Sequence, residues 1–170
     1  MAIRMKRKYK VIGVMGPSDT ATVKEMRCAR QLGRLIAEHG WVLLTGGVKA
    51  GVMDAANRGA KEAGGLTIGI IPRLESKIAS GVDIPIITDL GSARNNMNVL
   101  SCDIVIACGM SAGTGSEVCL ALQPRASKHV ILLNAGATAK DFFRSLRPEL
   151  VHVASSPTNA VALVKKLLRI

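Results

Sequence analysis

Lys10-Val-Ile-Gly-Val-Met15, followed at once by Gly16-Pro17-Ser18, is the stretch that decides the fold. Its run of apolar residues is typical of a buried strand, which Gly16-Pro17 ends. A second such run, Trp41–Thr45, ends in Gly46-Gly47. Between the two runs, Thr22-Val-Lys-Glu25 has the pattern of a capping box and predicts the start of a helix. A strand, a helix and a strand in this order predict a β-α-β unit with parallel strands.

The same alternation continues to the end of the chain. Further strands are expected at Leu66–Ile71, Ile84–Thr88, Asp103–Ala107, His129–Leu133 and Val151–Val153. Further helices are expected at Gly51–Ala63, Ser92–Ser101, Gly115–Leu122, Thr138–Arg147 (with Thr138 as N-cap) and Asn159–Leu168. Residues 73–83 form the one polar, irregular stretch. Helices between parallel strands cover both faces of a sheet, so we predict a single doubly wound α/β domain, Rossmann-like, over residues 10–170.

Length and composition agree with one globular domain. The chain has 170 residues, of which 48% are hydrophobic and 21% charged, and this excludes a disordered protein. No apolar run approaches the roughly 18–20 residues that span a bilayer. The run Val11–Met15 is too short for a secretory signal, so we expect a cytoplasmic protein with no membrane partner. Four cysteines without a C-x-x-C pair, and three scattered histidines, predict no structural metal and no disulfide framework.

The formal net charge of +11 favours an anionic partner. Much of this charge lies in the two tails, at Arg4, Lys6, Arg7, Lys8, Lys10, Lys165, Lys166 and Arg169. We interpret residues 1–9 as a basic N-terminal arm. The aromatic residues are Tyr9, Trp41, Phe142 and Phe143, too few to form a stacking platform for single strands. Nucleic acid is therefore not the expected partner.

Three loops that follow strands are rich in glycine. They are Gly16-Pro17-Ser18, Thr45-Gly46-Gly47 continuing to Gly51, and Gly109-Met110-Ser111 continuing through Gly113-Thr114-Gly115. Glycine lets a backbone approach a ligand closely, and the N–H groups at the following helix start bind phosphate. Because ligands of doubly wound sheets bind beyond the carboxyl ends of the strands, we predict a phosphorylated, anionic small molecule as the ligand.

The usual nucleotide motifs are missing from these loops. Gly13-Val-Met-Gly16 does not have the spacing G-x-G-x-x-G, and the second strand ends in Thr45-Gly46 rather than in an acidic residue. The chain also has no G-x-x-x-x-G-K-[ST] loop. We therefore expect neither NAD nor ATP as a cofactor.

Two charged residues are predicted to face the crevice. Arg94 follows Gly91-Ser92, and Glu117 lies in the first turn after the third glycine loop. Thr114-x-x-Glu117 is also a capping box, and Arg94 also suits the solvated face of a helix. The residues alone therefore leave a structural and a functional role open for each.

Gly113-Thr-x-x-Glu117 resembles the PGGxGTxxE signature of the "lonely guy", or lysine-decarboxylase-like, phosphoribohydrolase superfamily. Those enzymes release a base from a nucleoside 5′-monophosphate. The resemblance implies catalytic roles for Glu117, on water or the leaving base, and for Arg94, which would orient the sugar or stabilise charge. The chain departs from the signature at Gly109-Met110-Ser111, where Pro-Gly-Gly is expected. We expect the bulk of Met110 to narrow a loop that the hydrolases keep bare.

A fuller similarity is to the molybdenum-cofactor carrier proteins, a branch of the same superfamily. It rests on Val14–Pro17, Trp41–Gly47, Asp83–Ile86, Leu90–Asn95, the replacement Gly109-Met110 and the ending Phe142–Ala154. It implies a non-catalytic homo-oligomer, a dimer or tetramer, that binds and shields an oxygen-labile pterin and passes it to molybdenum enzymes.

In such a carrier, Arg94 and the amides of the glycine loops would hold the pterin phosphate and the anionic metal–dithiolene head. The implied binding set is Gly16, Pro17, Ser18, Thr45, Gly46, Gly47, Gly51, Ser92, Arg94, Asn95, Asn98, Gly109, Met110, Ser111, Gly113, Thr114, Gly115 and Glu117. The carrier, the phosphoribohydrolase and an unassigned nucleotide-binding role remain open at this point.

Overall fold

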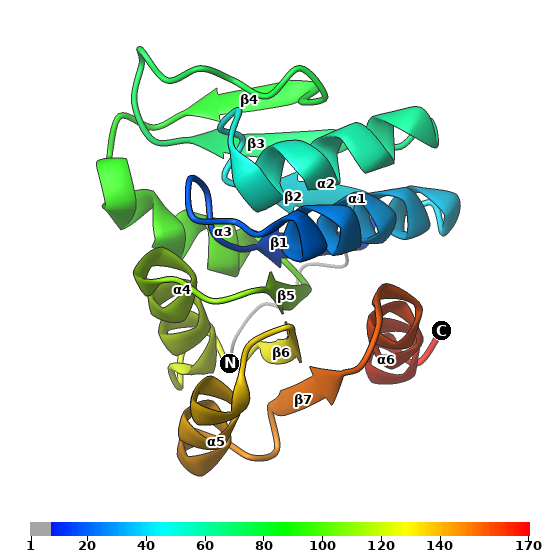
Figure 1. Cartoon of the computed structure of the whole chain (residues 1–170), viewed down its shortest axis with the longest axis vertical. Helices are drawn as coiled ribbons and strands as arrows, with labels where there is room; N and C mark the ends of the chain where they lie inside the picture. Colours follow the sequence, from blue (N-terminus) through cyan, green and yellow to red (C-terminus); the bar gives the residue numbers. More distant parts are fainter. Residues whose placement is uncertain (1–7) are drawn as a thin grey trace.

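The computed structural model describes residues 8–170, so most of the expected basic arm lies outside the described residues. Seven strands form one parallel sheet in the order β4-β3-β2-β1-β5-β6-β7 (Figure 1). The strands are β1 Val11–Met15, β2 Val42–Thr45, β3 Thr67–Ile71, β4 Ile84–Ile87, β5 Ile104–Cys108, β6 His129–Leu133 and β7 Val151–Ala154. The α-helices are α1 Val23–Glu38, α2 Gly51–Glu62, α3 Asn95–Ser101, α4 Ala112–Leu122, α5 Ala137–Leu146 and α6 Pro157–Leu168, with the 3-10 turn η1 at Gly91–Arg94. The predicted doubly wound α/β fold is confirmed.

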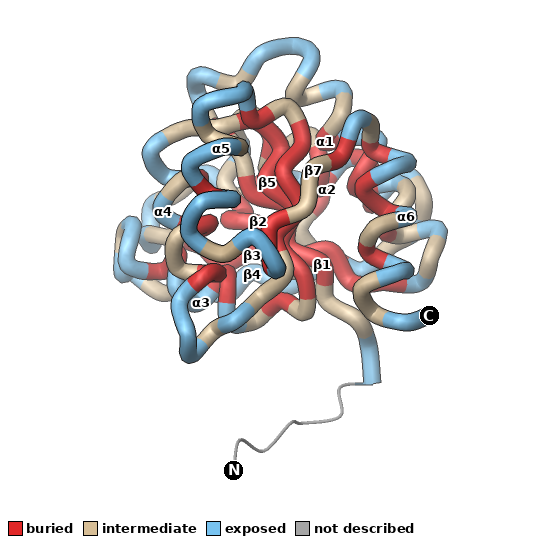
Figure 2. The backbone as a smooth tube through the Cα atoms, turned by 90° about the horizontal axis from the view of Figure 1, so that it is seen from below, coloured by how far each residue is buried: buried red, intermediate tan, exposed pale blue. Residues whose placement is uncertain are grey.

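The helices form a layer on each face of the sheet, and each layer has its own core. Ile12, Ile104 and Ile106 face the layer of α1, α2 and α6, and belong to one buried cluster. Val105 and Val130 face the layer of α3, α4 and α5, and belong to the other. Figure 2 shows these buried strands between the two sets of helices. Burial on both faces explains why the strands are continuous apolar runs in the sequence.

The strand order reverses at β1. The chain first runs outward through β2, β3 and β4, and then returns to β5 on the other side of β1. The loops after β1 and β5 therefore separate, and in this class of fold the crevice between them is where ligands bind. Figure 1 shows the loop after β1 beside the start of α2, above α4.

Two predicted helix starts are wrong. α4 begins at Ala112 rather than Gly115, because the hydroxyl of Ser111 accepts a hydrogen bond from the Thr114 N–H at 3.2 Å and caps the helix. Thr114-x-x-Glu117 is therefore no capping box, and Glu117 lies beyond the first turn. In α5 the N-cap is Gly136, without a side-chain cap, and the expected N-cap Thr138 lies inside the helix.

The other elements agree with the sequence to within one or two residues, with one change of geometry. The capping box of α1 is confirmed: Thr22 N–H donates to Glu25 Oε2 at 2.7 Å, and Glu25 N–H donates to Thr22 Oγ1 at 3.2 Å. The helix expected at Ser92–Ser101 is divided into η1 and α3. Within the described residues, no helix has the length and apolar character needed to cross a membrane.

Candidate functional site

A cavity of about 600 Å³ opens at the carboxyl ends of β1, β2, β3 and β5. It brings together residues from all three glycine loops and from η1. The sequence-predicted residues that line it are Gly16, Ser18, Gly46, Ser92, Arg94, Asn95, Ser111, Gly113, Thr114 and Glu117. We call this cavity the switch-point crevice.

The remaining predicted residues do not line the crevice. They are Pro17, Thr45, Gly47, Gly51, Asn98, Gly109, Met110 and Gly115. Thr45 is fully buried, and its hydroxyl accepts hydrogen bonds from the Gly47 N–H at 3.0 Å and from Asn57 Nδ2 at 2.9 Å. It thereby fixes the turn that presents Gly46. Gly51 has φ +48, and a Cβ there would collide with the carbonyl oxygens of Pro17 and Ser18, so a bare backbone is needed where the first two loops meet.

Met110 is partly buried and packs against the apolar cluster on the α3, α4 and α5 side of the sheet. It is not among the residues that line the crevice, and the narrowing of the loop by its bulk stays a prediction.

Arg94 reaches the crevice from η1 and is 9% exposed. Its guanidinium lies directly on the backbone of Gly46, since a Cβ at position 46 would be 2.7 Å from Nη1 and 2.8 Å from Nη2. Burial lowers its pKa, and the charge of Glu117 opposes that effect. Its Nε is buried and has no hydrogen-bond partner within residues 8–170. Arg94 thus packs against a glycine and keeps one N–H donor without a partner. Such an arginine is suited to bind an anionic group.

Glu117 projects from α4 and is 7% exposed. Asn98 Nδ2 donates to its Oε1 at 2.6 Å. Burial raises the pKa of Glu117 to about 7, although the Asn98 hydrogen bond and the charge of Arg94 both act to lower it. Burial therefore favours the protonated carboxyl to a higher pH than usual, so that Glu117 can donate or accept a proton near neutral pH.

The start of α4 offers a further anion-binding feature. Glu117 lies beyond its first turn, which contains no acidic residue, and Ser111 satisfies one of its free N–H groups. A Cβ at Gly113 would have only Ser111 Oγ near it, at 3.9 Å, so this part of the helix presents a bare backbone. The uncapped N–H groups and the helix dipole favour a negative group at this end.

Sequence reasoning missed part of the lining. The missed residues are Met15, Asp19, Val48, Met53, Pro72, Arg73, Ser76 and Gly91. Arg73 follows β3 directly, so the rule that residues after strands face the crevice would have found it. Val48 also forms an isolated bridge with Ile78, which holds the polar segment 73–83 beside the crevice. Val48 lies inside the second glycine loop, between Gly47 and Gly51, so the loop rule would have found it as well, whereas Met53 lies on α2, outside the loops. Among residues 8–170 no group of three or more His, Cys, Asp or Glu side chains could hold a metal ion.

The parallel sheet, its strand-order reversal and the crevice at that reversal define a Rossmann-like α/β protein with a small-molecule site at the switch point. Comparison with known proteins assigns the chain to a family. Residues 9–162 match the sequence model of the SLOG cluster4 family, and the chain belongs to that family.

Solved structures and one sequence relative add detail. The chain is 51% identical to the molybdenum cofactor binding protein of Rippkaea orientalis, with a TM-score of 0.91 over 95% of this chain and 98% of that one. It is 50% identical to the Moco carrier protein of Chlamydomonas reinhardtii, with a TM-score of 0.90 over 95% and 99% of the two chains. An uncharacterized protein of Archaeoglobus fulgidus is 43% identical over 116 residues, which are 68% of this chain and 76% of that one. The resemblance to the carrier branch is confirmed.

Proposed function

We propose that this protein binds, stores and protects the molybdenum cofactor and catalyses no reaction on it. The observation that carries the proposal is the match to two solved proteins, a cofactor-binding and a carrier protein, at about half identity over 95% of the chain.

The residues of the crevice fit such a ligand. Its volume of about 600 Å³ lies within the usual range for small-molecule sites. Arg94, with its buried and unpartnered Nε, would hold one anionic end of the pterin, and the bare start of α4 would hold the other. Asn95 Nδ2 donates to Ser116 Oγ at 2.8 Å, which leaves its carbonyl oxygen for the ligand. Ser92 and Ser111 would add neutral hydrogen bonds.

The predicted residues that do not line the crevice would act by positioning the residues that do. Thr45, Gly47 and Gly51 shape the loop that carries Gly46, and Gly46 in turn positions the Arg94 guanidinium. Asn98 holds Glu117. Pro17, Gly109, Met110 and Gly115 would likewise support the loops around the ligand, and Gly16, Ser18, Gly113 and Thr114 would contact it.

A phosphoribohydrolase is the second candidate, and Glu117 is the observation that favours it. A buried carboxyl with a pKa of about 7, in a crevice that also holds Arg94, suits general acid–base catalysis near neutral pH. In that case Glu117 would act on water or on the leaving base, and Arg94 would stabilise charge on the sugar phosphate.

One experiment separates the two functions. The protein is purified without oxygen, and its molybdenum content and its oxidised, fluorescent pterin are measured. A near-stoichiometric pterin that is lost in Arg94→Ala supports the carrier. The matched control is Arg144→Ala, which changes an exposed arginine in the last turn of α5. Absence of pterin, together with base release from AMP that stops in Glu117→Gln, would establish the hydrolase instead.

We also propose that the protein is a homo-oligomer, a dimer or tetramer. β3 and β4 pair in register, so Ile84 and Ile86 share the sheet face of Ile68 and Ile70. That face carries the core of α3, yet Ile84 and Ile86 are 43% and 40% exposed. On α3 itself, Met97 and Leu100 are also exposed. A second copy would cover this apolar surface and bring a neighbour close to the short helix after Arg94.

Sedimentation tests the oligomer. The wild-type protein should sediment as a multiple of 17.9 kDa at micromolar concentration, and Ile86→Lys should reduce its size. Ile170→Lys, at an exposed C-terminal residue, should leave its size unchanged. A wild-type particle of 17.9 kDa would remove the proposal.

The finer organisation is also proposed. Residues 10–170 would form the ligand-binding domain, and the basic arm of residues 1–9 would be dispensable, so a chain that starts at Tyr9 should assemble and load normally. Cys102 and Cys108 are buried, as small apolar side chains are. Buried cysteines of this kind agree with a protein that acts in the reducing cytoplasm. Molybdenum enzymes would be the recipients of the cofactor.

A further inference from the structure

Arg73 lines the switch-point crevice from the loop that follows β3, and the proposed function gives it no role. The residue is exposed, so its guanidinium is accessible from solvent rather than buried in the wall as that of Arg94 is. In the described part of the chain, Arg73 and Arg94 are the cations of the lining, and Asp19 and Glu117 are its carboxyl groups. The role of Arg73 therefore bears on how the crevice balances the charge of an anionic ligand.

Hydrogen bonds fix the backbone on both sides of Arg73. Gly91 N–H, at the start of η1, donates to the carbonyl oxygen of Pro72 at 2.9 Å. Further along the loop, Ala79 N–H donates to the carbonyl oxygen of Gly47 at 2.9 Å. The first bond joins this loop to η1, and the second joins it to the second glycine loop. The backbone of Arg73 is thereby held next to two other parts of the crevice wall.

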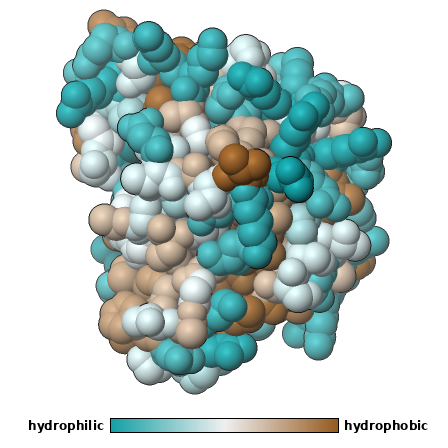
Figure 3. Space-filling view, in the orientation of Figure 1, coloured by the Kyte–Doolittle hydropathy of each residue, from teal (hydrophilic) through white to brown (hydrophobic). Residues whose placement is uncertain are grey.

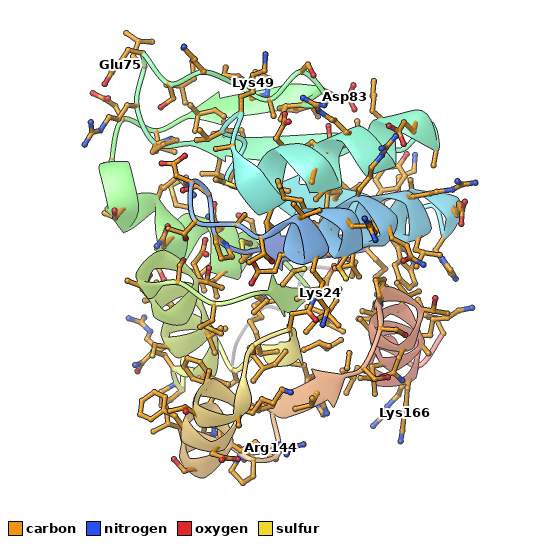
Figure 4. The ribbon with its side chains drawn as sticks, in the orientation of Figure 1. Lys24, Lys49, Glu75, Asp83, Arg144 and Lys166 are labelled. Carbon is orange, nitrogen blue, oxygen red and sulfur yellow. The ribbon has the colours of Figure 1, made fainter. Side chains whose placement is uncertain are left out.

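The guanidinium of Arg73 is not engaged by an acidic side chain. It forms no ion pair with any residue between 8 and 170. Glu75, two residues further on, does not line the crevice, and Figure 4 shows it at the outer end of the loop that follows β3. The charge of Arg73 is therefore available to a ligand.

Arg73 and Arg94 belong to the same end of the crevice. The Arg94 guanidinium lies on Gly46, directly after β2, and Arg73 follows β3, the next strand in the sheet. The start of α4 follows β5, which is three strand spacings from β3, or about 14 Å at about 4.8 Å for each spacing. The crevice therefore has a two-arginine end, over β2 and β3, and an α4 end, over β5.

A single guanidinium does not balance the charge of a phosphate group. A phosphate monoester carries roughly 1.5 to 2 negative charges at pH 7. The positive charge of Arg94 also interacts with Glu117 when that carboxyl is ionised. Arg73 would supply a second positive charge, and its planar fork of N–H donors matches the oxygens of an anionic group.

We propose that Arg73 joins Arg94 in holding one anionic end of the ligand, while the start of α4 holds the other end. Arg73 would thereby select for a multiply charged group at the two-arginine end. This inference rests on the proposed cofactor-binding function, since it concerns the same ligand. Because Arg73 is exposed, its contribution is a charge contact that salt screens, and it is smaller than that of the buried Arg94.

The test measures how fast the loaded protein loses its ligand. Wild type, Arg73→Gln and Arg73→Lys are purified without oxygen and dialysed anaerobically, while pterin and molybdenum per chain are followed with time. At low salt, Arg73→Gln should lose pterin roughly three- to fivefold faster than the wild type, as expected for one exposed charge contact. The difference should disappear at about 1 M salt, where the Debye length is about 3 Å. Arg73→Lys keeps the charge and should lose pterin more slowly than Arg73→Gln.

The two measurements also identify the group that Arg73 holds. If Arg73→Gln loses molybdenum before pterin, the metal–dithiolene head lies at the two-arginine end. If molybdenum and pterin are lost together, the phosphate lies there. Either order, together with the faster loss, supports the contact.

The matched control is Arg125→Gln, which changes an exposed arginine between α4 and β6 that does not line the crevice. It should lose pterin at the wild-type rate. Equal rates in Arg73→Gln and the wild type, an equal increase in Arg125→Gln, or a difference that persists at high salt would overturn the inference and leave the proposed function intact. Loss from Arg73→Lys as fast as from Arg73→Gln would do the same. A wild type without pterin would overturn the proposed function, and this inference with it.

Discussion

Replacement of Glu117 by glutamine should remove the pH dependence that this residue gives to stability. Burial raises the pKa of Glu117 from 4.5 to about 7 in the folded protein. A raised pKa in the folded state means that folding favours the protonated carboxyl. The contribution of Glu117 is therefore fully present below pH 4.5 and is lost as the pH rises to about 7. At about 1.36 kcal/mol for each pH unit of that interval, the loss amounts to about 3 kcal/mol at pH 8.

Glutamine has no proton to lose and keeps an oxygen for Asn98 Nδ2. The free energy of unfolding of Glu117→Gln should therefore equal that of the wild type near pH 4 and exceed it by up to about 3 kcal/mol at pH 8. Urea denaturation, followed by fluorescence of the single, buried tryptophan Trp41, measures both proteins between these pH values. Burial and the charge of His129 lower the pKa of His152, but this effect is common to both proteins and cancels in the difference.

The control is Glu75→Gln, which changes an exposed carboxyl on the loop after β3 and should give no pH-dependent difference. A difference between Glu117→Gln and the wild type that stays constant from pH 5 to 8 would refute the reasoning. It would mean that Arg94 keeps Glu117 ionised throughout, in spite of its burial.

Three other substitutions test the crevice and the turn behind it. Arg94→Ala should weaken binding of a phosphorylated ligand by roughly 1.5–3 kcal/mol in calorimetry, and unchanged affinity would remove Arg94 from the site. Gly46→Ala should also reduce pterin content, because its Cβ would displace the Arg94 guanidinium, while circular dichroism should show the same fold. Thr45→Val should lower the free energy of unfolding by roughly 1–3 kcal/mol, since it removes the acceptor of Gly47 N–H and one of the two acceptors of Asn57 Nδ2; an unchanged urea midpoint would contradict this.

The strands could be read from the sequence because burial on both faces makes them continuous apolar runs. β6, for example, is His129–Leu133 in both the prediction and the structure. The starts of α4 and α5 could not be read in the same way. Ser111 and Thr114 are both acceptable caps by residue type, and the spacing to Glu117 favoured Thr114, whereas the structure has Ser111 as the cap and Glu117 bound by Asn98. At α5 the chain enters the helix through a left-handed glycine, which leaves Thr138 inside it.

Part of the candidate site was predictable because its residues follow strands. Gly16 and Gly46 directly follow β1 and β2, Ser111 lies three residues after β5, and all three line the crevice. Met110 lies even closer to β5 than Ser111, yet it does not line the crevice and packs, partly buried, against the core. Met53 enters the lining from a helix, and its position depends on how α2 packs. The spacing of residues along the sequence does not indicate that Met110 is absent from the crevice lining or that Met53 is part of it.

Hydrophilic side chains cover most of the molecular face around α1 and α2, and more apolar ones gather over α4 and α5 (Figure 3). Phe142 and Leu146 on α5 are about half exposed. This second apolar region, away from β4, offers another contact surface within the proposed oligomer.

Asn98 determines what the two charged residues of the crevice can do, although it does not line the crevice itself. An ionised Glu117 free to turn toward Arg94 would form an ion pair and occupy the guanidinium donors. Asn98 Nδ2 instead holds the carboxyl, and burial brings its pKa close to neutrality, so the attraction between the two residues is weakened. No ion pair within 4 Å joins Arg94 to Glu117 in the described chain, and Arg94 Nε stays without a partner. An arginine left free in this way suits the retention of an anionic ligand, because binding then breaks no existing ion pair.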